Sequence, residues 1–238
     1  MHRLPAHVKV VTLLAFVIAV VATPREAFWA FGVYAALLVA VAFVARVPGP
    51  FILRRMVVEI PFVVFALLLP FIAAGERVDV LGLSLSQEGL LAGWNILAKG
   101  TLGVVASILL AATTDARSLL LALQRLRVPP VLVEITSFMV RYADVITDEM
   151  RRMKIARESR GFVGGSRRQL GVVAASAGAL FIRSYERGER VHLAMLSRGY
   201  AGQLPVLEVQ TAAPVQWVSA ALVPLTALVV SVVAWMTL

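Results

Sequence analysis

Five long apolar runs constrain this chain more than any other feature of its sequence. They cover about residues 8–23, 27–45, 57–74, 90–113 and 215–236. Each approaches or exceeds the roughly 17 to 20 residues that a helix needs to cross the hydrocarbon core of a bilayer. Only 16% of the residues are charged, well below the quarter or so that is typical of soluble domains. We therefore predict an all-α integral membrane protein with about five transmembrane helices, surrounded by lipid.

The positive charge is concentrated in one block of the chain, between Ala116 and Gly202. This block holds 15 Lys and Arg residues against 7 Asp and Glu residues, so it carries +8 of the total net charge of +9. Cytoplasmic segments of membrane proteins are enriched in Lys and Arg. Arg3 and Lys9 stand at the start of the chain, and the connection over residues 76–88 is not enriched in basic residues. We expect the N-terminus and the basic block to be cytoplasmic and the C-terminus to lie outside.

The first run has an alternative interpretation as a secretory signal peptide. A basic start followed by an apolar stretch is typical of such signals. The next residues, "TPREAFWAF", lead at once into another apolar run and contain no clear small-x-small cleavage site. We favour a membrane span.

Inside the basic block the apolar pattern becomes one-sided. Thr114 or Asp115 can cap a first helix, which the paired prolines at 129–130 end. A second helix of about 30 residues begins there and has apolar residues at three- and four-residue spacings. We therefore divide the chain into a four-span bundle (1–113), a domain of long amphipathic cytoplasmic helices (114–202), and a linker with the last span (203–238).

Two helices of the block end in nearly the same seven letters. "ARESRGF" stops the second helix at Gly161, and "AMLSRGY" stops a third helix, over about residues 169–198, at Gly199. Glycine ends helices because it adopts the left-handed conformation without strain. The apolar first half of the third helix is too short to cross a bilayer. We expect this helix to lie against the inner surface of the bundle.

The repeated arginines Arg160 and Arg198 admit two interpretations. A cation in the last turn stabilises a helix end by about 0.3 to 1 kcal/mol. Capping alone does not require the same alanine, serine and aromatic residue around each arginine. Two similar helix ends suggest two similar binding sites on a partner, which a dimeric partner supplies. Arginine suits such sites because its planar fork bonds carboxylates or carbonyls bidentately.

These helix ends, after about four spans and before a last one, resemble the T component of energy-coupling factor (ECF) transporters of bacterial and archaeal cell membranes. Three stretches look most like its cobalt-type branch: "EGLLAGWNILAKGTLGV", "DEMRRMKIARESRGF" and "RSYERGERVHLAMLSRGYAG". The resemblance implies a coupling subunit for cobalt or nickel uptake, with a vitamin-binding partner as the alternative. Its partners are an ABC ATPase dimer and a substrate-binding membrane (S) subunit.

By motif position, the resemblance makes Arg160 and Arg198 the residues that dock in the grooves of the ATPase dimer. Their neighbours Ser159, Gly161, Ser197 and Gly199 complete the two docking ends. Serine precedes each arginine where the family has alanine. A small residue is kept, so we expect docking to survive.

The sequence offers no chemistry of its own. "GFVGGSRR" lacks the pattern G-x-x-x-x-G-K-[ST], so the phosphate-binding loop is missing and ATP hydrolysis falls to a partner. The histidines His2, His7 and His192 are not at ligand spacing. We expect no enzyme activity, no catalytic residue, no cofactor and no metal site.

Lys99 is the one charge deep in an apolar run, with Asn95 one turn away. Intramembrane cations usually face the bundle interior or a polar cavity. One interpretation places Lys99 against the S subunit; the one we favour places it on a polar group of this chain, such as Glu59.

Two other functions remain as alternatives. A stand-alone secondary transporter would have several charged or broken spans. A scaffold held to lipid or nucleic acid by charge alone would need no repeated ends. Seven acids inside the basic block argue against nucleic acid as a partner.

Overall fold

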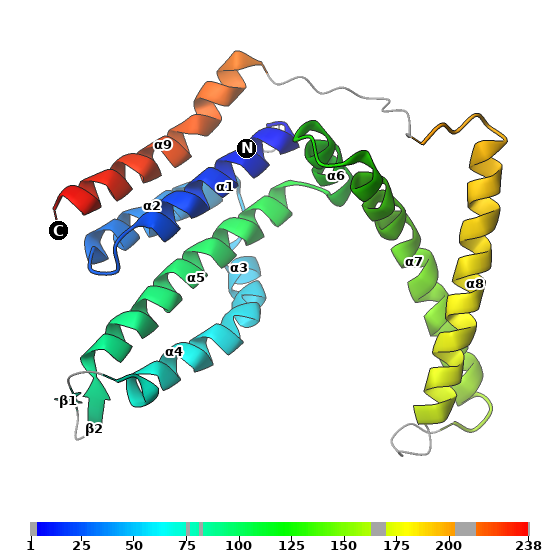
Figure 1. The fold of residues 1–238 in the computed structure, drawn as a ribbon, viewed down its shortest axis with the longest axis horizontal. Coiled ribbons are helices and arrows are strands. Elements are labelled where there is room, and N and C mark those ends of the chain that lie inside the picture. The colour runs from blue at the N-terminus through cyan, green and yellow to red at the C-terminus, as the bar shows by residue number, and fades with distance from the viewer. Residues whose placement is uncertain (1–3, 75–76, 81–82, 163–169, 203–212, 238) are drawn as a thin grey trace. The chain divides into compact units, whose positions relative to one another are not determined.

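The computed structural model describes residues 4–74, 77–80, 83–162, 170–202 and 213–237 (Figure 1). The chain forms two compact units. Met1–Ala122 and Gln210–Leu238 make up the first, and Leu123–Val209 makes up the second.

The apolar runs are helical, as the sequence predicts. Helices α1 (Ala6–Ala22), α2 (Phe28–Val44), α5 (Gln87–Thr113) and α9 (Pro214–Met236) are each continuous. Within the described residues, three segments are long and apolar enough to cross a membrane: Gly49–Ile72, α5 and α9. Helices α1 and α2 are apolar but shorter, with 17 residues each. The prediction of an all-α protein of the membrane type is confirmed.

The third apolar run differs from the prediction of one helix over residues 57–74. It starts earlier and is divided into α3 (Gly49–Arg55), a 3-10 turn η1 (Met56–Glu59) and α4 (Ile60–Ile72). Pro61 stands in the first turn of α4. Because proline has no N–H, the helical hydrogen bond back to the preceding turn cannot form at this position.

A small β-hairpin, which has no counterpart among the predicted elements, precedes α5. Strand β1 (Arg77–Val80) pairs with β2 (Leu83–Ser86) in antiparallel register, with Arg77 opposite Ser86. The side chain of Ser86 then caps α5, because its Oγ accepts a hydrogen bond of 3.2 Å from the backbone N–H of Gly89. The hairpin therefore fixes where α5 begins.

The core of the first unit lies among α1, α2, α5 and α9 (Figure 1). Tyr34 of α2 is fully buried there. Its hydroxyl lies 2.8 Å from the hydroxyl of Thr23 and donates to the carbonyl of Ala227 in α9 at 3.2 Å. This polar tie joins the first, second and last spans inside an apolar core.

A buried lysine connects α1 with the end of α5. The ammonium of Lys9 donates to the carbonyl of Thr113 at 2.7 Å, and Lys9 is only 8% exposed. A cation is favourable at a helix C-terminus, where carbonyls lack intrahelical partners. Lys9 is therefore part of the bundle as well as of its basic start.

Helix α6 (Ala116–Arg125) crosses from the first unit into the second. Of the two residues predicted to cap it, Asp115 does so: its Oδ2 accepts a hydrogen bond of 3.2 Å from the backbone N–H of Ser118. Hydrogen bonds from Ser118 also lower the pKa of Asp115.

The second unit is built on α7 (Pro130–Glu158) and α8 (Leu170–Leu196), the two long helices that the sequence predicts. They run in opposite directions (Figure 1). Of their residues, only Val133 is buried. An ion pair joins them, between the guanidinium of Arg183 and Oε1 of Glu149 at 2.6 Å. Whether α8 lies against the membrane bundle stays a prediction.

Candidate functional site

The ends of α7 and α8, which we call the Ser-Arg-Gly ends, have the same backbone conformation. They consist of Ser159–Gly161 and Ser197–Gly199. Both glycines are left-handed, with φ of +79° at Gly161 and +83° at Gly199. Only glycine adopts this conformation without strain. The sequence prediction of where both helices stop is confirmed.

The hydrogen bonds of the two ends match one for one. The N–H of Phe162 donates to the carbonyl of Arg157 at 3.1 Å, and the N–H of Tyr200 donates to the carbonyl of Met195 at 3.0 Å. This bond, over five residues, defines the Schellman motif. The N–H groups of both serines, both arginines and both glycines also have matching partners, with lengths that agree within about 0.1 Å.

The two serine hydroxyls turn back onto their own helices. Ser159 donates to the carbonyl of Ala156 at 3.1 Å, and Ser197 donates to that of Ala194 at 3.0 Å. The departure from alanine in the family signature therefore supplies one extra local hydrogen bond at each end.

We expect Ser159→Ala and Ser197→Ala to change the free energy of unfolding by no more than about 0.5 kcal/mol, because the hydroxyls are exposed and bond only locally. Gly161→Val should instead cost about 1 to 2 kcal/mol through its positive φ. Thermal unfolding in detergent measures both. A serine variant as unstable as Gly161→Val would contradict this account.

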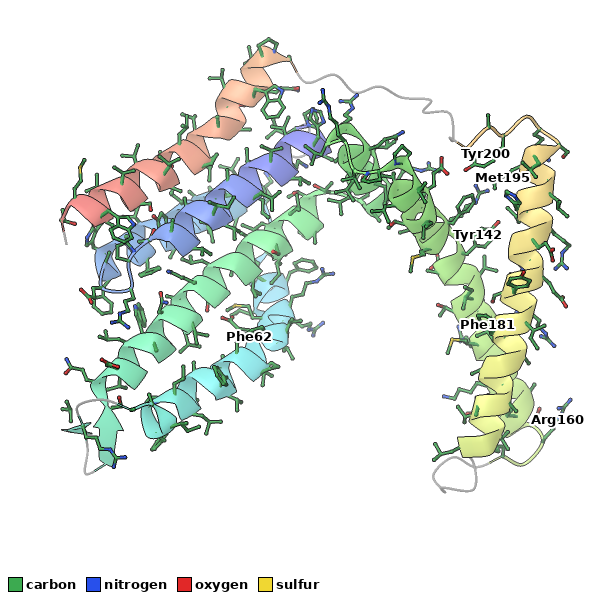
Figure 2. The ribbon with its side chains drawn as sticks, viewed as in Figure 1. Phe62, Tyr142, Arg160, Phe181, Met195 and Tyr200 are labelled. Atoms are coloured by element: carbon green, nitrogen blue, oxygen red, sulfur yellow. The ribbon has the colours of Figure 1, made fainter. Side chains whose placement is uncertain are left out.

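Arg160 and Arg198 are both exposed. Within the described part of the chain, neither guanidinium forms an ion pair with a carboxylate. Figure 2 shows Arg160 and Tyr200, which is two residues after Arg198, at opposite ends of the α7–α8 pair. Helix α8 has 27 residues, so the two arginines are separated by roughly 40 Å.

The aromatic residues beside the two glycines differ in their partners. The guanidinium of Arg157 lies 5.8 Å from the centre of the Phe162 ring, within the first end. The hydroxyl of Tyr200 instead donates to the carboxylate of Glu134, near the start of α7. This hydrogen bond raises the pKa of Tyr200 above its usual value. A hydrogen bond across 66 residues leaves no local signal, so Glu134 cannot be recognised from the sequence alone.

Lys99 bonds within the chain, as the favoured interpretation holds, but to a different group. Its ammonium donates to the backbone carbonyl of Val21 at 2.8 Å. Glu59, the partner suggested from the sequence, is buried and accepts a hydrogen bond from Thr101 instead. Asn95, one turn before Lys99, has a buried side-chain oxygen without a hydrogen-bond partner among the described residues.

Lys99 completes the capping of α1. The last four carbonyls of a helix have no intrahelical partner and need others. In α1 the hydrogen-bond donors to these four carbonyls are the hydroxyl and N–H of Thr23, the ammonium of Lys99 and the indole N–H of Trp235. The indole N–H donates to the carbonyl of Ala22 at 2.9 Å. The lysine thus has a structural role within the bundle, whether or not a partner contacts it.

Lys99→Met is expected to destabilise the isolated protein by about 0.5 to 1.5 kcal/mol, because it removes the hydrogen bond that the Val21 carbonyl accepts at the end of α1. Lys99→Arg keeps a cationic donor and serves as the matched control. The midpoint of thermal unfolding in detergent measures the difference. Equal midpoints for Lys99→Met and the parent chain would exclude the capping role.

Comparison with known proteins now identifies the family. Residues 1–210 match the CbiQ family, described as cobalt transport protein. The chain belongs to this family. Among the described residues, no group of three or more His, Asp or Glu side chains is placed to hold a metal ion.

Three relatives illustrate the similarity. An uncharacterized protein of Methanocaldococcus jannaschii is 31% identical over 56% of this chain and 50% of its own length. The cobalt transport protein CbiQ of Rhodobacter capsulatus is 34% identical over 44% of this chain and 43% of its own length. A putative fused cobalt transport protein CbiMQ of Methanocorpusculum labreanum is 30% identical over 48% of this chain and 19% of its own length. These three matches cover half or less of the length of each of these three relatives.

Proposed function

We propose that the chain is the non-enzymatic coupling subunit of an ECF-type importer. It passes the ATP-driven motion of an ABC ATPase dimer to a substrate-binding membrane subunit. The observation that carries the proposal is the pair of matching Ser-Arg-Gly ends, each of which presents an exposed arginine without an ion pair in the described structure.

The spacing of the two ends supports a wide, two-fold partner. Arg160 and Arg198 lie at opposite ends of a helix pair about 40 Å long. Two similar binding sites for these arginines, separated by this distance, fit the two subunits of a dimer better than one small domain. The sequence has no phosphate-binding loop, so the coupling of transport to ATP requires that this dimer supply the nucleotide site.

Cobalt is the proposed cargo, with nickel as the close alternative. The family description and the printed name of the Rhodobacter relative both refer to cobalt transport. The relative whose printed name is a putative fused cobalt transport protein CbiMQ supports a CbiM-type membrane subunit as the partner. The basic residues of the N-terminus and of residues 114–202 support a cytoplasmic location for both.

Gentle purification from native membranes tests the proposal. A tagged chain should co-purify with an ABC ATPase and a second membrane subunit. Vesicles that contain the complex should take up Co²⁺ only when ATP is present on the side of the membrane where the ATPase subunits lie. Vesicles without this chain are the control. Uptake by this chain alone, or uptake by its partners without it, would overturn the assignment.

A further inference from the structure

The two Ser-Arg-Gly ends have the same backbone conformation, but the aromatic residue that follows each end makes a different contact. At the first end, Phe162 stays against its own helix, under the guanidinium of Arg157. At the second end, Tyr200 reaches away from α8 and donates its hydroxyl to Glu134 of α7. One oxygen atom, on the Tyr200 ring, therefore distinguishes the two ends in their links to the rest of the helix pair.

Few side chains are fully buried where α7 and α8 lie together. Of the residues in these helices only Val133 is buried, so the polar contacts between the helices help to fix the angle between them. The Arg183–Glu149 ion pair lies near the middle of α8 and in the second half of α7. The Tyr200–Glu134 hydrogen bond lies at the end where α7 begins. Two polar contacts at separate points restrict the angle between α7 and α8, whereas a single contact allows the helices to rotate about it.

We propose that Tyr200 and Glu134 are positioning residues that fix the second docking arginine, Arg198, against the start of α7. This inference rests on the proposed function. Displacement of Arg198 by the ATPase then moves the N-terminal end of α7 directly, whereas displacement of Arg160 moves its C-terminal end. The two arginines thus dock alike but transmit motion to different ends of the same helix.

A reciprocal exchange tests the proposal with minimal change. Tyr200→Phe removes the donor from the second end, and Phe162→Tyr adds a hydroxyl at the first end as the matched control. The chain has no cysteine, so spin labels can be placed at Val131→Cys and Leu193→Cys, two exposed sites near the start of α7 and the end of α8. Distances between the labels are measured by pulsed electron resonance in the chain alone and in the ATPase complex.

Tyr200→Phe should broaden the distance distribution in the chain alone, and Phe162→Tyr should leave it unchanged. In the complex, Tyr200→Phe should keep its affinity for the ATPase but lower Co²⁺ uptake per ATP hydrolysed by about fivefold, a factor typical of one lost hydrogen bond. A merely structural residue would not separate affinity from coupling in this way.

The proposal is overturned if Tyr200→Phe leaves the distances unchanged, if Phe162→Tyr broadens them equally, or if uptake per ATP is unaffected. The measurement on the chain alone does not involve the ATPase. A parent chain that binds no ATPase would therefore defeat the proposed function, while the hydrogen bond itself is still tested by the distances.

Discussion

Arg160→Glu together with Arg198→Glu is expected to abolish co-purification of the ABC ATPase. Both guanidiniums are exposed and have no carboxylate partner in the described structure, so they are available to a partner. Buried interfacial arginines commonly contribute about 2 to 5 kcal/mol each when truncated, and reversal of the charge adds repulsion. The loss of both should weaken the complex by at least about 10³-fold.

A charge-matched control separates docking from general electrostatics. Arg151 and Arg187 lie on the same two helices, away from the Ser-Arg-Gly ends. Arg151→Glu with Arg187→Glu makes the same change in net charge and should leave co-purification intact. Loss of the ATPase in both double variants, with a steep dependence on salt, would show a surface attracted by charge alone.

Each arginine by itself should matter, because the two ends have matching geometry. Arg160→Ala and Arg198→Ala are expected to weaken binding by about 2 kcal/mol or more, roughly thirtyfold. Titration of the ATPase onto immobilised chain measures this. If one of the two has no effect, the ends are not equivalent docking elements.

Gly93→Ala is expected to have the largest effect on the stability of the membrane bundle. A Cβ atom at Gly93 of α5 would lie 2.7 Å from the carbonyl oxygen of Ala66 in α4. At Gly89, one turn earlier, it would lie 2.7 Å from the carbonyl oxygen of Leu69. Both obstacles are backbone atoms, so relief requires the two helices to move apart. Overpacking of this kind costs about 1 to 3 kcal/mol.

Gly103→Ala is the matched control, because it lies in the same helix and a Cβ there would meet nothing within 4 Å. Alanine is also the better helix former, by about 1 kcal/mol in an exposed helix interior. The midpoint of thermal unfolding in detergent should therefore fall for Gly93→Ala and stay or rise for Gly103→Ala. Equal midpoints for the two variants would mean that α4 and α5 do not pack as closely as described.

Features that depend on neighbouring residues could be predicted from the sequence. Of the five spans that the apolar runs predict, four are continuous helices, since a span needs only enough consecutive apolar residues. The two glycines predicted where α7 and α8 end, because a positive φ is a local requirement. The repeat predicted two matching ends, and their hydrogen bonds match. The break at η1 also had a local cause in Pro61, which the apolar pattern concealed.

The partners of polar groups were decided only by the tertiary structure. Lys99 was expected to find a polar group of the chain, but its partner is the carbonyl of Val21 and not Glu59. The hydrogen bond of Tyr200 to Glu134 and the close approach of α5 to α4 at Gly93 likewise join residues far apart in sequence. A sequence states which groups need a partner, since apolar surroundings make an unpaired one costly. Which partner each receives depends on how the helices pack, and that packing brings together residues that no local pattern relates.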